Sequence, residues 1–471
     1  MRDGAVAAAA SLFRRAVAVT PSQSPADLSR RLTLLGQALA PSGGAREAAD
    51  VLEEAIGAAR AARAAGDPGW RTHFARAVEE LATLHYERIR FTEAWRLGDA
   101  ALAEMGDLDD LDTARVRLAR SRGRTGETNE VEGWVRDCER AIDAAVAAGD
   151  GNAEYEFRRD LAGARSEAGE ATADDWAALA EIARARDDAL TEVKARIAVA
   201  RYRMESLPAD VPGILEPARE LALARGFVER LGWIDQVTAE AALGSGDWDT
   251  AIDAGLRAVE LGERHGYDRI SVRSWTALLP AASLRGRTRV LEHATAWFGE
   301  RTGRLPGSPY ARVLQAGVDL HRATGGVGAA TTPDLEHVRP AFRIWLEMGG
   351  YAWVAATDAI VDAWFAARRL DWVDELLAEA EAAPLPPDSP SPTTSAAFTL
   401  VRARRDLAAA GDPERAADRV RAQLAILERI DVPFWLARAI RALEESGVAT
   451  DREIAGRAAI EARLGVVRPT L

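Results

Sequence analysis

The fold is decided by residues 32–55, which read LTLLGQALAPSGGAREAADVLEEA. Three leucines stand three and four residues apart, a spacing typical of one helix face: Leu32, Leu35 and Leu39. Gly36, a small residue beside the second leucine, lets a neighbouring helix approach closely. A glycine turn follows at Gly43, and a second apolar face then begins with Ala48, Leu52 and Ala55. The stretch therefore predicts two helices joined by a turn.

The same pattern recurs outward from this stretch. Further copies start at Val78, Trp275 and Leu400, and the clearest start of a second helix is Gly246-Asp247-Trp248. The second-helix positions step by about 41 residues on average, close to the length of known two-helix repeats. The length of 471 residues alone suggests about three domains, but about ten units of this size fill the chain. The sequence predicts one all-α helical-repeat array over 1–471, because no alternating β-branched runs are bounded by hairpin turns.

Glycine, proline and capping residues mark the expected boundaries of the helices. Gly-Asp pairs such as Gly66-Asp67 and Gly149-Asp150 are typical of a helix end followed by a new helix start. A Pro-rich surface loop is predicted at 383–395, because clustered prolines interrupt helices. A capping C-terminal helix is predicted at 450–465, where Thr450 and Glu453 have the spacing of a capping box.

The spacing of small and large apolar residues resembles tetratricopeptide repeats in their longer form. Residues 51–60, followed by Gly66-Asp67, are similar to the usual second helix, and residues 459–466 look like the end of such an array. These repeats are found in large bacterial signalling ATPases and in regulators of the maltose-activator type. The resemblance implies a right-handed superhelical solenoid of about ten stacked antiparallel helix pairs. It also implies a bacterial signalling or regulatory context and a concave face that binds partners.

The ATPase and effector modules of those proteins have no counterpart in this sequence. A phosphate loop requires glycines followed by Lys and Ser or Thr. The chain has a single lysine, Lys194, which lies in a predicted helix with no glycine nearby. What this leaves is the sensor or scaffold portion, with no cofactor expected.

Composition excludes several other classes. The net charge of −13 and the interleaving of Arg with Asp and Glu disfavour nucleic-acid binding, which requires a clustered basic stripe. The best basic run, 117–124, spreads over more than one helix face. Cys138 is the only cysteine and the six histidines are scattered, so neither a disulfide framework nor a metal site is expected. No apolar stretch is long enough to span a membrane, and a cytoplasmic protein is expected.

Four local features have a structural interpretation that outweighs a chemical one. His85 occupies a core position of a repeat, where a satisfied packing role is the default, and Cys138 is expected as a buried small apolar residue. The acidic run 107–112 departs from a calcium loop and is expected to cap the helix that starts near Asp112. The glycines at 325–328 are expected to form a loop between repeats, because the order strand, glycines, helix of a dinucleotide site is missing.

Seven aromatic residues fall between positions 342 and 372. The first interpretation is that tryptophans fill wide gaps between stacked helix pairs. The second is that some line the inner groove as rigid anchors, with arginines holding a carboxylate or phosphate. The ligand or partner set of this second interpretation is Arg343, Trp345, Tyr351, Trp353, Trp364 and Arg368.

Three functions remain open from the sequence. The leading hypothesis is a non-catalytic scaffold or regulatory module that binds a protein or peptide segment on its concave face. The alternative is a sensor domain of a signalling or transcription-regulatory system that binds a small molecule or peptide. The third, an enzyme, predicts a deep closed pocket with carboxylates of raised pKa.

Overall fold

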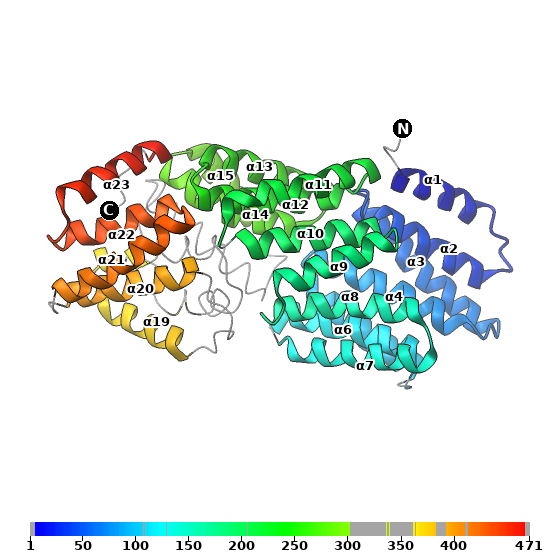
Figure 1. The fold of residues 1–471 in the computed structure, drawn as a ribbon. Helices are drawn as coiled ribbons and strands as arrows, with labels where there is room; N and C mark the ends of the chain where they lie inside the picture. The colour runs from blue at the N-terminus through cyan, green and yellow to red at the C-terminus, as the bar shows by residue number, and fades with distance from the viewer. Residues whose placement is uncertain are drawn as a thin grey trace. The chain divides into compact units, whose positions relative to one another are not determined.

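A computed structural model describes residues 5–106, 108, 110–128, 130–204, 206–301, 336, 339, 361–362, 364–382, 392–409 and 413–466. Within these ranges the secondary structure is helical and contains no β-strand, which confirms the all-α prediction (Figure 1). The helices pack in adjacent pairs. In these same ranges no helix is long and apolar enough to cross a membrane.

The helices alternate between the first and second members of the pairs. The first helices are α2 (Pro25–Leu39), α4 (Trp70–Glu87), α6 (Leu111–Thr128), α8 (Gly151–Glu167), α10 (Ala189–Met204), α12 (Val228–Ser245), α14 (Asp268–Leu284), α20 (Pro392–Ala408) and α22 (Pro433–Glu445). The second helices are α3 (Ala45–Ala64), α5 (Phe91–Met105), α7 (Glu132–Ala148), α9 (Ala173–Ala185), α11 (Val211–Arg225), α13 (Trp248–His265), α15 (Thr288–Arg301), α21 (Pro413–Ile430) and α23 (Asp451–Leu464). Three elements complete the set: α1 (Ala5–Ala18), the 3-10 helix η1 (Pro208–Asp210) and α19 (Leu370–Ala382).

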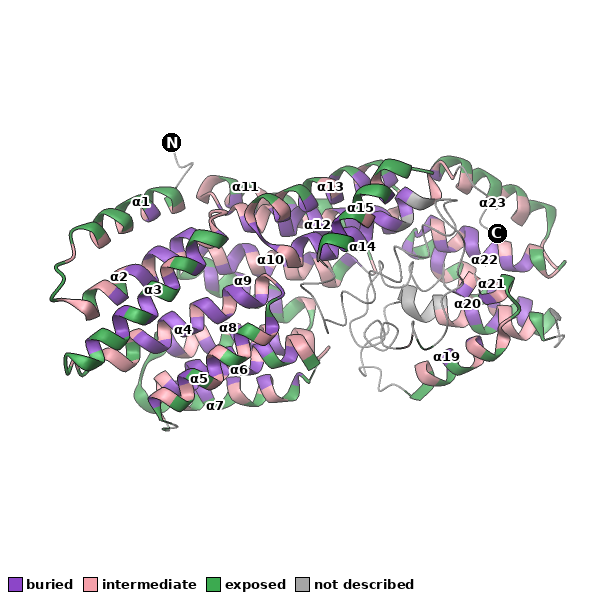
Figure 2. Cartoon of the chain, turned by 180° about the vertical axis from the view of Figure 1, so that it is seen from behind, coloured by how far each residue is buried: buried purple, intermediate pink, exposed green. Residues whose placement is uncertain are grey.

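The pair α2 and α3 confirms the two helices joined by a turn that were predicted from residues 32–55. The two predicted apolar faces are buried against each other, with Leu32 and Leu52 each 1% exposed. A Cβ atom at Gly36 would lie 2.6 Å from Cγ of Leu52, so the two helices cross where only a glycine fits. By contrast α1 is mostly exposed, with Ala10 as its buried residue (Figure 2).

The predicted boundary signals act as expected. Helix α13 begins at Trp248, two residues after Gly246, which has a φ of +83°. Such a positive φ is strained for residues with a Cβ atom, so a glycine is favoured at this turn.

The chain divides into two compact units. Unit 1 comprises residues 1–199, 216–234 and 260–271, and unit 2 comprises residues 200–215, 235–259 and 272–471. In unit 1 the first helices follow one another, with α2 in contact with α4 and α4 in contact with α6.

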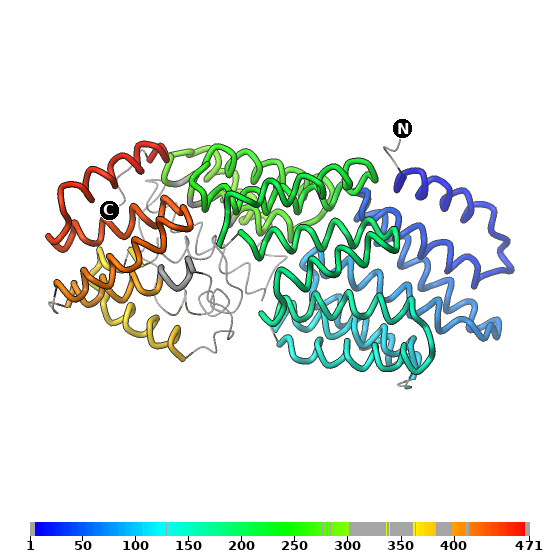
Figure 3. The backbone as a smooth tube through the Cα atoms, viewed as in Figure 1, coloured from blue at the N-terminus to red at the C-terminus, as the bar shows by residue number. Residues whose placement is uncertain are grey.

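Unit 1 also contains contacts between segments that are far apart in the sequence. The Tyr267 hydroxyl donates to the carbonyl oxygen of Ala40, and Nδ1 of His265 lies 2.8 Å from the carbonyl oxygen of Gly43. The backbone N–H of Glu229 donates to the carbonyl oxygen of Pro41 at 3.3 Å. The turn after α2 therefore packs against the α13–α14 turn and the start of α12, and the chain between them can be followed in Figure 3. In an open solenoid each repeat contacts only its neighbours; unit 1 instead closes on itself.

Unit 2 has a similar long-range contact, made by the C-terminal helix. Leu464 in α23 is fully buried in an apolar cluster with Trp248 and Phe434. The carbonyl oxygen of Leu464 accepts a 2.8 Å hydrogen bond from Nε of Arg285. Thr450 and Glu453 form the predicted capping box at the start of α23, so this helix is confirmed.

The Pro-rich loop predicted at 383–395 lies outside the described residues up to 391. Helix α20 begins at Pro392, so residues 392–395 are helical and the predicted loop extended too far. Proline is favoured in the first helical turn because its missing N–H has no helical partner there. The single array over 1–471 and its right-handed superhelical path stay predictions.

Candidate functional site

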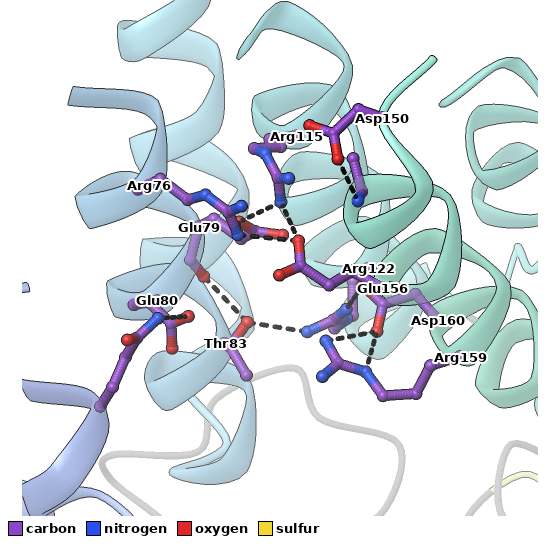
Figure 4. A network of polar contacts seen from close by, with 12 residues as sticks. Arg76, Glu79, Glu80, Thr83, Arg115, Arg122, Asp150, Glu156, Arg159 and Asp160 are labelled. Atoms are coloured by element: carbon purple, nitrogen blue, oxygen red, sulfur yellow. Dashed lines mark hydrogen bonds and ion pairs between the residues drawn. The ribbon is translucent and has the colours of Figure 1, made fainter. Parts of the chain in front are cut away.

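Charged and polar side chains gather on three consecutive first helices of unit 1, where they form a charge cluster (Figure 4). Its members are Arg76, Glu79 and Thr83 of α4, Arg115 and Arg122 of α6, and Glu156, Arg159 and Asp160 of α8. On each helix the members stand mostly three, four or seven residues apart, which places them on one face. The cluster therefore results from the same periodicity that builds the apolar faces of these helices.

One half of the charge cluster is centred on Arg115. Its Nη1 lies 3.2 Å from Oε2 of Glu79 and 2.8 Å from Oε2 of Glu156, and its side chain is only 4% exposed. Arg76 reaches the same oxygen of Glu156 at 2.8 Å. The guanidinium of Arg115 also lies over the ring of Phe157, 4.9 Å from its centroid. These contacts join α4, α6 and α8 through a buried ion-pair network.

Glu79 is the most perturbed carboxyl group of this network. Burial raises its pKa to about 7, against the opposing effect of Arg115. Glu229 of α12 has a raised pKa for the same main reason, burial, and its carboxylate accepts from Nε1 of Trp233. Both carboxyl groups have protein partners at hydrogen-bond distance, so their raised pKa has a structural origin.

The other half of the charge cluster is centred on Asp160. Nη2 of Arg122 lies 2.8 Å from Oδ2 of Asp160, and Nη1 of Arg122 donates to Oγ1 of Thr83 at 2.8 Å. Arg159 contacts the other oxygen, Oδ1, only at 3.5 Å. Burial alone would raise the pKa of Asp160, but the cations Arg122, Arg159 and Lys194 outweigh it and lower the pKa. Asp160 is therefore ionised and surrounded by more cations than it neutralises.

Lys194 of α10, the next first helix along the chain, acts electrostatically on the same carboxylate, because its charge helps to lower the pKa of Asp160. It forms no hydrogen bond or ion pair with any residue in the described part of the chain. Burial lowers its pKa to about 8; Asp160 opposes this shift, while Arg230, Arg159 and Arg122 add to it. The side chain is nevertheless only partly buried and keeps contact with solvent. An enclosed cation that solvent still reaches is suited to bind an anion.

Arg269 of α14 links further helices of unit 1. Its guanidinium lies 3.0 Å from Glu167 and 3.4 Å from Glu87, between α8 and α4. It also stacks over the rings of Tyr86 and Trp233, at 4.6 and 5.5 Å from their centroids. Arg269 thus contributes to the closure of unit 1 next to the Tyr267 contact.

The aromatic site predicted from the sequence falls largely outside the described residues: Arg343, Trp345, Tyr351 and Trp353 lie there. Of the other two members, Trp364 is fully buried and packs edge-on against Trp372 with ring centroids 5.7 Å apart. Arg368 is exposed and follows a helical turn with a positive φ of 54°. The structure therefore places Trp364 in the core, and the ligand role of the set stays a prediction.

The structure confirms that Cys138 and His85 are buried, as the sequence predicted. Cys138 is fully buried, as predicted, and burial raises the pKa of its thiol, so it is not a reactive thiolate. His85 is buried as expected, but its Nδ1 has no hydrogen-bond partner, so its packing role is confirmed and its satisfaction is not. Burial also lowers the pKa of His85 to about 4.

Two predictions about charged residues concern helix α6. Asp110 caps this helix by accepting from the backbone N–H of Thr113 at 2.8 Å, as the acidic run suggested. The basic run at 117–124 lies on α6 with its members on different faces, where Arg120 and Arg124 pair with Asp99 and Arg122 pairs with Asp160. The glycines at 325–328 lie outside the described residues.

The charge cluster was not identified from the sequence. Its signal was the i, i+3 and i, i+7 spacing of Arg76, Glu79 and Thr83 beside an apolar face. Because charged residues are common on helix faces, that spacing alone did not show that three helices direct them toward one another. No protein-family model matches the chain, and no curated protein sequence matches it.

Proposed function

We propose that this chain is a non-catalytic helical-repeat module that binds an acidic segment of a partner protein at the Asp160 half of the charge cluster. The observation that carries the proposal is the excess of cations there. Arg122 holds the carboxylate of Asp160 at 2.8 Å, Arg159 contacts it at 3.5 Å, and Lys194 adds to the positive charge that lowers its pKa. A chain that binds a partner segment without catalysing a reaction has a regulatory or scaffolding role.

The accessibility of Arg159 supports this proposal. Its side chain is 31% exposed, and its contacts with Asp160 lie at the 3.5 Å limit of a hydrogen bond. A guanidinium has five donors in a fixed fork, and most of those of Arg159 have no partner among the described residues. The side chain therefore has donors left for a carboxylate of a partner.

The non-catalytic part of the proposal rests on the partners of the perturbed groups. A raised carboxyl pKa is the feature that an enzyme hypothesis predicts, and Glu79 has one. However, Glu79 is 9% exposed and forms an ion pair with Arg115, while Cys138 is fully buried. A general base must reach its substrate, and these side chains are covered by neighbouring helices.

The experiment uses two adjacent arginines of α8 as a matched pair. A partner is first identified by photo-crosslinking in producing cells, and its acidic segment is then titrated against the purified chain by calorimetry. Arg159→Glu is expected to weaken binding at least about tenfold, since one charge-assisted contact is worth about 1.5–3 kcal/mol. Arg158→Glu is the control, because Arg158 is 59% exposed and pairs with Glu154 of its own helix.

The result can contradict the proposal in two ways. Equal losses for Arg158→Glu and Arg159→Glu would mean that general charge, not the Asp160 site, holds the segment. Unchanged affinity for both variants would place the binding surface elsewhere on the chain.

A second candidate function, a sensor for a small anionic ligand, is favoured by the closure of unit 1. The contacts of Tyr267 with Ala40 and of His265 with Gly43 hold the α13–α14 turn against the turn after α2. A small ligand that binds only the folded chain should raise the melting temperature in a thermal-shift screen. A scaffold that recognises an extended acidic segment should instead show a larger shift with that segment than with a small anion at the same concentration.

A further inference from the structure

Arg269 of α14 is held in unit 1 by side chains from three other helices. Its Nη2 lies 3.0 Å from Oε1 of Glu167 on α8, and its Nη1 lies 3.4 Å from Oε1 of Glu87 on α4. The ring centroids of Tyr86 on α4 and Trp233 on α12 lie 4.6 and 5.5 Å from its guanidinium carbon. We call the four side chains that surround Arg269 the guanidinium site.

The guanidinium site combines two kinds of contact that favour a guanidinium cation. The carboxylates of Glu87 and Glu167 each accept from a different Nη atom, and such charge-assisted hydrogen bonds are strong. The aromatic rings attract the cation to their faces. A lysine ammonium is compact and lacks the planar fork that reaches two carboxylates while it stacks on a ring. The site is therefore built for arginine rather than for lysine.

The guanidinium site continues the charge cluster along the same faces of α4 and α8. Glu87 stands four residues after Thr83, and Glu167 stands seven residues after Asp160. Residues with these spacings lie on one face of a helix. A segment that runs along these faces from the charge cluster therefore reaches the guanidinium site.

The Arg269 side chain can leave the site while the backbone of α14 stays in place, because its long stem has several rotatable bonds. Solvent reaches the site, since the side chains of Arg269, Glu87 and Glu167 are 15%, 24% and 27% exposed. A ligand from outside can thus approach the two carboxylates. The guanidinium carbon of Arg269 marks the place that the ligand would take.

We propose that the guanidinium site binds an arginine side chain or another guanidinium ligand from outside the chain, and that Arg269 is an internal competitor that keeps the site closed. This inference goes beyond the proposed function, because it assigns a second site for a ligand of opposite charge. It does not depend on binding at the Asp160 half of the charge cluster.

The test removes the competitor and offers small cations in its place. Arg269→Ala is titrated with methylguanidinium and with methylammonium at low, constant ionic strength, and ligand-detected NMR gives the dissociation constants. Methylguanidinium should bind at least about tenfold more tightly than methylammonium, since the ammonium loses one charge-assisted contact. If Arg269 closes the site at least nine-tenths of the time, the unchanged chain binds methylguanidinium at least about tenfold more weakly than Arg269→Ala.

Matched variants separate the site from general charge. Arg264→Ala is the control for Arg269→Ala, because Arg264 is 65% exposed and pairs with Glu260 of its own helix. It should bind methylguanidinium as the unchanged chain does. In the Arg269→Ala background, Glu167→Gln should weaken methylguanidinium binding at least about tenfold, whereas Glu154→Gln on the same helix should leave it unchanged.

Circular dichroism checks that each variant keeps its helix content. If Arg269→Ala does not fold, Arg269→Lys takes its place, because lysine keeps the charge and the apolar stem but not the planar fork. Arg269→Lys should then bind methylguanidinium more tightly than the unchanged chain does.

Two further ligands separate the possible sources of the guanidinium group. Tighter binding of free arginine than of the peptide acetyl-Gly-Arg-Gly-amide would indicate a small-molecule ligand, and the reverse order would indicate an arginine of a partner protein. Equal affinities of Arg269→Ala for methylguanidinium and methylammonium would overturn the inference. So would an equal gain in methylguanidinium affinity for Arg264→Ala and Arg269→Ala.

Discussion

At the scale of single residues, the protonation of Glu79 links the charge cluster to stability. Its ordinary pKa of 4.5 is raised to about 7, mainly by burial. Between these pH values the folded chain holds a proton at Glu79 that the unfolded chain has released. Stability therefore falls as the pH rises through this window, because the folded state binds more protons there.

Glu79→Gln should remove this pH dependence. The amide fits the same space and does not titrate, so the variant has no proton to lose between pH 4.5 and 7. The melting temperature of the unchanged chain, measured by calorimetry, is expected to fall relative to that of Glu79→Gln across this range. If the melting temperatures of the two proteins change in parallel with pH over this range, Glu79 does not titrate as described.

What the sequence predicted well at this scale is packing. Gly36 was identified from spacing alone as a position where a neighbouring helix approaches closely, and the structure places Leu52 of α3 there. The relation of Asp160 to Arg122 and Lys194 was not predicted, because it joins three helices whose relative rotation the spacing does not fix. In the sequence, Lys194 served only to exclude a phosphate loop. That arginines of other helices act on it could be recognised only from the folded chain.

At the scale of helices, glycines set how closely neighbours approach. A Cβ atom at Gly123 in α6 would lie 2.7 Å from the backbone nitrogen of Trp95 in α5. Backbone atoms cannot move aside as a side chain can, so any larger residue must separate the two helices. Gly57, in the exposed middle of α3, has no atom within 4 Å of such a Cβ and serves as the control.

Gly123→Ala should therefore destabilise the chain by about 1–3 kcal/mol, the usual cost of overpacking. Gly57→Ala should stabilise it by about 0.5–1 kcal/mol, because alanine loses less backbone entropy in a helix. Urea denaturation followed by circular dichroism measures both. Stabilisation by both alanines would mean that α5 and α6 are not in close contact at Gly123.

At the scale of the compact units, each unit taken by itself contains contacts between segments that are far apart in the sequence. The sequence predicted α23 as a capping helix, and its capping box is present. Its last apolar residue, Leu464, is nevertheless a core residue beside Trp248 of α13. Repeat spacing describes contacts between neighbours in sequence, so it carries no information on a contact of this kind.

Leu464→Ala should loosen α13 as well as α23. Removing this fully buried side chain is expected to cost about 2–5 kcal/mol, the range for leucine-to-alanine changes in a core. Hydrogen exchange measured by mass spectrometry should increase in residues 242–256 in addition to 451–464. Arg463→Ala, at the exposed neighbouring position, should leave both segments protected; increased exchange confined to α23 would mean that α23 is only a terminal cap.

The closure of unit 1 has a consequence for the time course of synthesis. Ala40 leaves the ribosome 227 residues ahead of Tyr267, its partner across the closing contact. At about 5–20 residues per second, that interval lasts about 10 to 45 s. During this time the first helix pairs are complete while the turn at 40–44 is still uncovered. A nascent chain stalled before Tyr267 should therefore expose this turn to proteases, and one stalled well beyond it should protect it.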